Sequence, residues 1–171
     1  MKIRQISLLS VIGALYAALV IVFVPISYGP IQLRIADCLI PLSAIFGWPA
    51  ILGVSMGALI SNAYYWLGPA DVVLGTLANL VSAATIYYLR RSLFTACLLG
   101  AILVGVIVGG YLWIYFPPPD FPVSLPVWGS MMVSISLSSL ITISLFGYLL
   151  VKAIKSSGFL KEWGKKNHLK S

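Results

Sequence analysis

The feature that most constrains this chain is a series of long apolar stretches, several of them as long as a bilayer is thick. A transmembrane helix needs about 20 consecutive, mainly apolar residues. Hydrophobic residues make up 60% of the 171 residues and charged residues only 9%, and a soluble domain of this length could not cover so much apolar surface. The strict alternation that is typical of membrane β-strands is missing. The sequence therefore predicts an all-α integral membrane protein.

Glycine, proline and charged residues divide the apolar sequence into six predicted transmembrane helices. We expect them at residues 6–26, 33–46, 50–66, 71–89, 93–116 and 127–154. They form one predicted domain over residues 1–154, which is followed by a basic tail over residues 155–171. The second helix is short because Pro49 follows it, and proline has no backbone donor and restrains the residue before it.

The basic residues predict how the chain lies in the membrane. Ten of the eleven fall on one side of a six-helix arrangement, and an excess of Lys and Arg marks the cytoplasmic side. We therefore expect a multi-pass protein of the cell membrane with both termini and the basic tail in the cytoplasm. The exception is Arg34, at the outer end of the second predicted helix, and Asp71 lies on the same side. The net charge of +7 is thus explained by orientation and does not indicate nucleic-acid binding.

Strongly polar side chains stand among apolar residues in the first half of the chain. Ionisable groups inside a membrane are unfavourable by roughly 2.5–3.5 kcal/mol on insertion scales, so they need a partner or a function. We interpret this set as candidate substrate-binding residues: Gln32, Arg34, Asp37, Asn62, Asp71 and Asn79. An outward-facing cation and anion indicate a site that opens to the outside.

Each of these residues also has a purely structural interpretation. Arg34 can snorkel to lipid headgroups, and Asp71 can satisfy free amides at the start of a helix. Asp37 lies one turn after Arg34 and can pair with it, so whether Arg34 pairs with Asp37 or Asp71 stays open. Asn62 and Asn79 can bond to each other across a helix interface. The aromatic residues near outer helix ends, Tyr65 and Tyr111 among them, mostly predict an interfacial belt, and one or two of them are candidates to stack on a planar ligand.

Enzyme motifs are poorly supported. Residues 53–57 match G-x-S-x-G, but they fall inside a predicted helix, whereas a nucleophile elbow needs a strand–turn–helix and a histidine base. The only histidine is His168, in the tail. The sequence contains no metal-binding motif and no phosphate-binding loop. We therefore predict a binding protein without enzymatic activity, metal or cofactor, and without an ATPase of its own.

The first predicted helix carries two pairs of small residues at a spacing of four. Gly13 and Ala17 form one pair, and Ala14 and Ala18 form the other. Small residues at this spacing allow a second helix to approach closely in lipid. They predict either packing within the chain or a docking face for a partner subunit.

Residues 32–83 resemble the QueT family of queuosine-precursor transporters, which are substrate-binding (S) components of energy-coupling-factor transporters. The resemblance rests on Arg34, Ile35, Asp37 in place of a glutamate, Leu39, Gly53, Gly57, Asn62, Asp71, Gly75, Thr76, Leu77 and Ala78. In addition, Ala14-x-x-x-Ala18 is similar to the motif with which S components contact the shared transmembrane coupling subunit. Together these residues cover about half of the chain.

The resemblance implies a six-helix S-component fold that binds a nucleobase-like small molecule, a 7-deazaguanine, from outside. Arg34 and Asp71 would anchor the base, Asn62 and Asn79 would support the site, and the coupling subunit with two ATPases would drive release. The family's acidic residues near the last two helices are missing here, which favours a neutral base such as 7-cyano-7-deazaguanine over the cationic 7-aminomethyl form. The alternatives are an S component for another vitamin-like molecule and a structural membrane subunit without a ligand.

Overall fold

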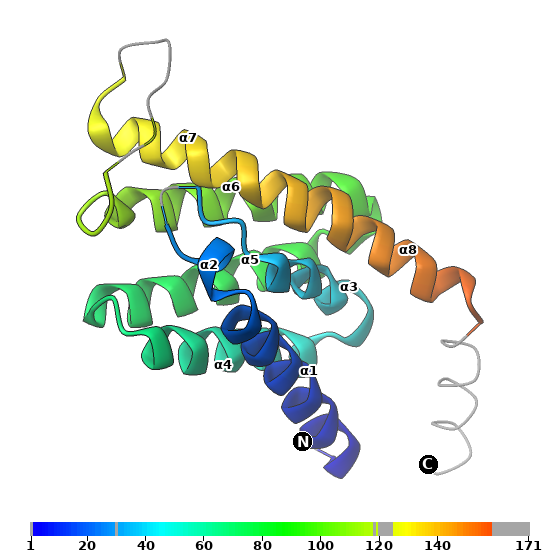
Figure 1. Cartoon of the computed structure of the whole chain (residues 1–171). Coiled ribbons are helices and arrows are strands. Elements are labelled where there is room, and N and C mark those ends of the chain that lie inside the picture. Colours follow the sequence, from blue (N-terminus) through cyan, green and yellow to red (C-terminus); the bar gives the residue numbers. More distant parts are fainter. Residues whose placement is uncertain (1, 30, 118, 120–124, 159–171) are drawn as a thin grey trace.

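The computed structural model describes residues 2–29, 31–117, 119 and 125–158 (Figure 1). Every regular element in these residues is helical, which confirms the predicted all-α class. Within the described residues, four helices are long and apolar enough to cross a membrane, namely Ile3–Val22, Asp71–Tyr88, Arg90–Leu112 and Val127–Ser156. The count of six transmembrane helices stays a prediction, and most of the predicted basic tail, residues 159–171, lies outside the described residues.

The helical elements occur in the following order. They are α1 (Ile3–Val22), α2 (Val24–Ser27), the 3-10 helix η1 (Ile35–Leu42), α3 (Ser43–Phe46), α4 (Trp48–Tyr65), the π-helix η2 (Asp71–Gly75), α5 (Thr76–Tyr88), the 3-10 helix η3 (Arg90–Ser92), α6 (Leu93–Leu112), α7 (Val127–Ser139), the π-helix η4 (Leu140–Gly147) and α8 (Tyr148–Ser156). η2 continues into α5, and α7 continues through η4 into α8.

The predicted helices and the observed ones differ mainly at their ends. The first predicted helix ends early, at Val22, and Pro25 lies within the short α2 that follows. The second begins as a 3-10 helix that contains Pro41. It stops at Gly47, whose φ of 66° is readily adopted only by glycine. Proline near the start of α4 is well placed, because the first helical amides have no partner within the helix.

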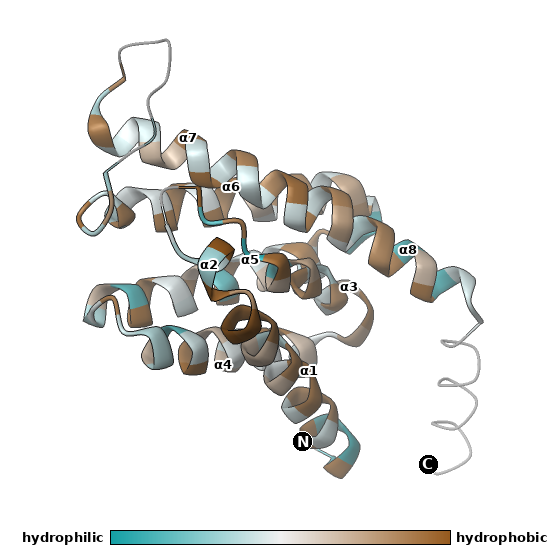
Figure 2. Ribbon diagram, in the orientation of Figure 1, coloured by the Kyte–Doolittle hydropathy of each residue, from teal (hydrophilic) through white to brown (hydrophobic). Residues whose placement is uncertain are grey.

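Several strongly polar residues are buried, while many large apolar side chains are exposed. Large hydrophobic side chains such as Val11, Ile102 and Leu137 are exposed, whereas Arg34 and Asp71 are buried. Figure 2 shows hydrophilic residues at the N-terminal end of α1 and along α8, at the ends of the predicted spans. This distribution is the reverse of a soluble protein's and is the one expected for helices that face lipid.

Glycine residues bring α1 very close to α4. A Cβ added to Gly57 would lie 2.7 Å from the backbone oxygen of Gly13 and 2.7 Å from Cβ of Tyr16, and one added to Gly53 would lie 2.9 Å from a backbone oxygen of α1. The two backbones can approach this closely only because these glycines have no side chain. Close approach at small residues is a common way of packing helices in membranes.

The two pairs of small residues on α1 lie on different faces. Gly13 and Ala17 are buried, and Gly13 contacts α4. Ala14 and Ala18 are exposed. The structure therefore uses the first pair for packing within the chain and leaves the second pair available at the surface.

The α1–α4 contact can be tested with a matched pair of Gly→Ala variants. Gly57→Ala should lower the free energy of unfolding by about 1–3 kcal/mol, because the methyl group overpacks the contact. Gly110→Ala on α6 is the control, since a Cβ there meets only the end of the Met132 side chain, at 3.3 Å. Thermal unfolding in detergent should give a lower Tm for Gly57→Ala alone, and equal Tm values would contradict the close contact.

Candidate functional site

All six candidate residues are buried although they come from five different parts of the chain. Gln32 lies in the loop after α2, Arg34 and Asp37 lie at the start of η1, Asn62 lies on α4, and η2 and α5 contribute one residue each. The exposed fractions are 6% for Gln32, 4% for Arg34, 3% for Asp37, 0% for Asn62, 0% for Asp71 and 1% for Asn79. Arg34 therefore does not snorkel to the surface.

The side chain of Asn62 connects three of these parts. Its Oδ1 accepts hydrogen bonds from Nη2 of Arg34 and, at 3.2 Å, from the hydroxyl of Tyr28. Its Nδ2 donates to the backbone oxygen of Asp71 at 3.1 Å. One amide thus holds the loop before η1, helix α4 and the start of η2 together.

The carboxylate of Asp71 points into the protein and does not cap its helix. Its Oδ1 accepts a hydrogen bond from the hydroxyl of Tyr111 on α6 at 2.8 Å, and Oδ2 is buried without a hydrogen-bond partner in the described residues. Gly75, one turn later, leaves room for this arrangement. A Cβ there would collide with Nδ2 of Asn62 and lie 3.2 Å from the Tyr111 hydroxyl.

Asp37 belongs to a second, deeper group. Its Oδ1 accepts a hydrogen bond of 2.5 Å from the hydroxyl of Tyr16 on α1, and Tyr16 also interacts with Asn79. Among the described residues, Arg34 forms no ion pair with either aspartate, although both interact with it electrostatically. The two possible pairings of Arg34 are thus replaced by a bond to Asn62. The hydrogen bond between Asn62 and Asn79 that the sequence suggested is also absent from the described part of the chain.

Four of the six candidates have a buried polar atom without a hydrogen-bond partner in the part of the chain that the structure describes. These atoms are Nε2 of Gln32, Nε of Arg34, Oδ2 of Asp71 and Nδ2 of Asn79. The other buried atoms of this kind are serine hydroxyls, on Ser27, Ser43, Ser82 and Ser144. Leaving a buried polar group unpaired is unfavourable by about 1–3 kcal/mol. Three donors and one acceptor among the candidate residues are therefore unpaired, and unpaired buried groups of this kind call for an explanation.

The sequence analysis missed three tyrosines. Tyr16 and Tyr28 were not singled out, and Tyr111 was assigned to the interfacial belt, but its side chain is only 5% exposed and it binds Asp71. Tyr28 also stacks on Tyr65 with 3.9 Å between ring centroids and 12° between planes. The belt interpretation fits Tyr64, which is 69% exposed. A hydroxyl within an apolar stretch was the available signal, since a buried Tyr usually has a polar partner.

The G-x-S-x-G match has no catalytic geometry. It lies within α4, and the hydroxyl of Ser55 donates to the backbone oxygen of Ile51 at 2.8 Å. Within the described residues there is also no group of three or more His, Cys, Asp or Glu side chains that could hold a metal ion.

Comparison with known proteins agrees with a binding function. The profile of the QueT transporter family matches residues 6–156. The queuosine precursor transporter QueT of Lactococcus lactis subsp. cremoris (strain MG1363) is 36% identical over 84 residues, which are 47% of this chain and 47% of that protein. The chain thus aligns with about half the length of this curated relative, and no solved structure matches it.

The extent of the family match decides the class of protein. It covers nearly all of the described helices, from α1 to the end of α8, and the family consists of transporters and not of enzymes. The apolar helices of this chain are long enough to cross a membrane. The chain belongs to the QueT transporter family.

Proposed function

We propose that this protein is the substrate-binding S component of an energy-coupling-factor transporter and that it takes up a queuosine precursor, a 7-deazaguanine base, from outside. The observation that supports this most is the set of four buried, unpartnered polar atoms on Gln32, Arg34, Asp71 and Asn79. Family membership and the name of the Lactococcus lactis relative, a queuosine precursor transporter, support the choice of substrate.

A guanine-like base matches the chemistry of the cluster. Its N–H and amino groups form a donor edge for Oδ2 of Asp71, and its carbonyl accepts from Nε of Arg34. Asn62 holds both residues in place through its two hydrogen bonds. Nδ2 of Asn79 is a further donor for an acceptor on the ring.

The position of the cluster along the helices supports access from outside. Asp71 lies at the start of the span Asp71–Tyr88, and Arg90 and Arg91 follow the end of that span. Basic residues mark the cytoplasmic side. We therefore propose that the protein has six transmembrane helices, that both termini lie in the cytoplasm and that the site lies near the outer ends of the helices.

The exposed face of α1 supports docking to a coupling subunit. Ala14 and Ala18 are exposed and leave the helix backbone open to close approach by a partner helix. We propose that the transmembrane coupling subunit binds there and that its two ATPases supply the energy, because the sequence contains no phosphate-binding loop of the G-x-x-x-x-G-K-[ST] type.

Two other functions are possible for this protein, and ligand-binding measurements can distinguish them from the proposed one. An S component for another vitamin-like molecule would use the same cluster with a different ligand. A structural membrane subunit would need no ligand, but it leaves the unpartnered atoms of Arg34 and Asp71 without a function. The cluster therefore favours a binding subunit.

Isothermal titration of the detergent-solubilised protein with 7-cyano-7-deazaguanine tests the substrate and the site together. Asp71→Asn keeps the size of the side chain but places an amide where the base presents donors, so binding should weaken about 10- to 150-fold. Thr85→Val, near the other end of α5, is the control, since its hydroxyl bonds only to Val81 of its own helix, and it should bind normally. A folded wild type that does not bind this base would contradict the proposed substrate.

A second experiment tests docking. When the coupling subunit and the ATPases are co-expressed, Ala14→Leu should abolish their copurification with this chain, because the larger side chain blocks close helix approach. Ala63→Leu, an equally exposed alanine on α4, should copurify normally. Both variants should still bind the base. Unchanged copurification of Ala14→Leu would exclude this face of α1 as the docking surface.

A further inference from the structure

A tyrosine near the end of α6 occupies one of the two carboxylate oxygens of Asp71. The hydroxyl of Tyr111 donates to Oδ1 at 2.8 Å, and the tyrosine side chain is only 5% exposed. An ionised carboxylate has only acceptors. Oδ2, the second oxygen, is buried and has no hydrogen-bond partner among the described residues. The bond to Tyr111 therefore leaves Oδ2 as the oxygen that is available to a donor from outside the protein.

The same bond fixes the direction of the carboxylate. The backbone oxygen of Asp71 accepts from Nδ2 of Asn62 on α4 at 3.1 Å, and its side chain accepts from Tyr111 on α6. The residue is thus held at two points by two different helices. A side chain that is already held in place loses less conformational entropy when a ligand binds to it.

The helix that carries Tyr111 is closely packed against α7. A Cβ added to Gly105 would collide with Ser136, and one added to Gly109 would collide with the backbone of Met132. Close approach of this kind at small residues is a common way of packing membrane helices. Since Gly109 lies only two residues before Tyr111, the hydroxyl extends from a well-fixed part of α6.

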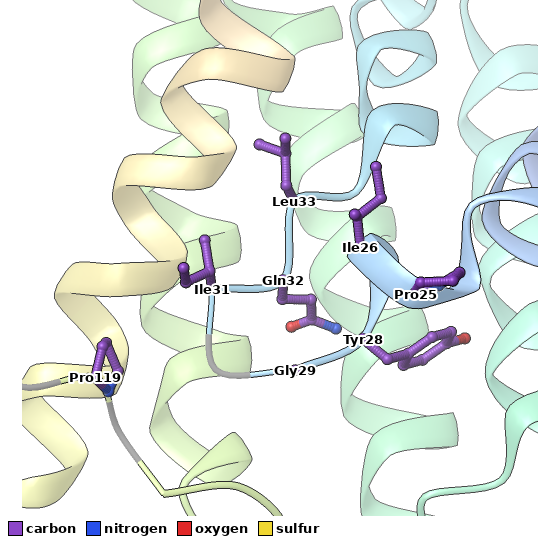
Figure 3. Close-up of a pocket in the computed structure, with 8 residues that line it drawn as sticks. All are labelled: Pro25, Ile26, Tyr28, Gly29, Ile31, Gln32, Leu33 and Pro119. Atoms are coloured by element: carbon purple, nitrogen blue, oxygen red, sulfur yellow. The ribbon is translucent and has the colours of Figure 1, made fainter.

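The other side of the cluster is formed by the loop between α2 and η1. Tyr28 and Gln32 lie on this loop, outside any helix, and Figure 3 shows both among the residues that line a pocket. Because Oδ2 of Asp71 is buried, a base can reach it only if part of the cluster opens. Contacts of the loop can open without breaking the bond between Tyr111 and Asp71, since neither residue belongs to the loop.

We propose that Tyr111 is a positioning residue for the substrate: its bond to Oδ1 holds the carboxylate of Asp71 so that Oδ2 accepts from the donor edge of the base. This inference rests on the proposed function. Tyr111 acts through Asp71 and does not itself bind the base. Without the hydroxyl the carboxylate can rotate, and the base has to fix its direction during binding, which lowers the affinity.

A double-mutant cycle tests this role. Isothermal titration with 7-cyano-7-deazaguanine compares the wild type, Tyr111→Phe, Asp71→Asn and the double variant, at base concentrations up to the millimolar range for the weak binders. Tyr111→Phe should weaken binding about three- to tenfold, the usual effect of losing one hydrogen bond. In the Asp71→Asn background the same change should weaken binding by about twofold or less, because the carboxylate that Tyr111 positions is already absent.

A purely structural role of Tyr111 predicts a different result. General loosening of the fold would weaken binding by the same factor in both backgrounds. Tyr115→Phe is the matched control, since it removes a tyrosine hydroxyl four residues later that forms no hydrogen bond within the described residues. It should bind the base like the wild type. Thermal unfolding in detergent checks that each variant is folded.

A structure of the wild type with bound base provides a test that needs no variant. The hydroxyl of Tyr111 should stay within hydrogen-bonding distance of Oδ1 of Asp71, and a donor of the base should lie at Oδ2. If the base binds both oxygens, or if the tyrosine has turned away from Asp71, the inference is overturned even where Tyr111→Phe cannot be purified.

The outcomes distinguish this inference from the proposed function. If the wild type binds the base and Tyr111→Phe binds equally well, or if its loss is the same in both backgrounds, Tyr111 does not position Asp71 and the proposed function stands. If the folded wild type does not bind the base, both are overturned. A loss that depends on Asp71 supports the inference.

Discussion

The candidate site depends on one amide, that of Asn62. Within a membrane protein there is little water to satisfy a buried guanidinium, so Arg34 needs acceptors from the protein itself. Oδ1 of Asn62 is such an acceptor, and the same atom also binds Tyr28. Because Nδ2 donates to the backbone at Asp71, this one side chain links the loop, α4 and η2.

The remaining polar atoms show how the site differs from an ordinary buried network. A fully paired network stabilises and rigidifies a protein, whereas a partly paired one is destabilising. Arg34 and Asp71 each use part of their hydrogen-bonding capacity on the protein and leave one atom unpaired. This division holds the groups in a fixed orientation and still leaves donors and an acceptor for a ligand.

Much of the fold class and of the residue set could be predicted from the sequence. Apolar stretches predicted the helices, and isolated polar residues such as Arg34 and Asp71 predicted a buried polar cluster, because both signals follow from the high energy of polar groups in lipid. The partners of these residues could not be predicted. The bond between Tyr111 and Asp71 joins residues 40 positions apart, and periodicity carries no information about such contacts.

The local backbone conformation could not be predicted from the sequence either. The second predicted helix was placed at residues 33–46, but it begins at Ile35 as a 3-10 helix, and Gln32, shortly before it, has a positive φ of 44°. No propensity favours glutamine in that conformation. The two pairs of small residues on α1 looked equivalent in the sequence, and only packing on α4 shows which pair faces inward.

The glycine contact between α1 and α4 has a mechanical consequence. Since the backbone of Gly13 fits directly against Gly57, neither helix can slide or roll against the other without a steric clash. Asn62 lies only five residues beyond Gly57 on the same helix. If a partner tilted α1, we would therefore expect α4 to tilt with it. Asn62 and the polar cluster around it would then move together with both helices.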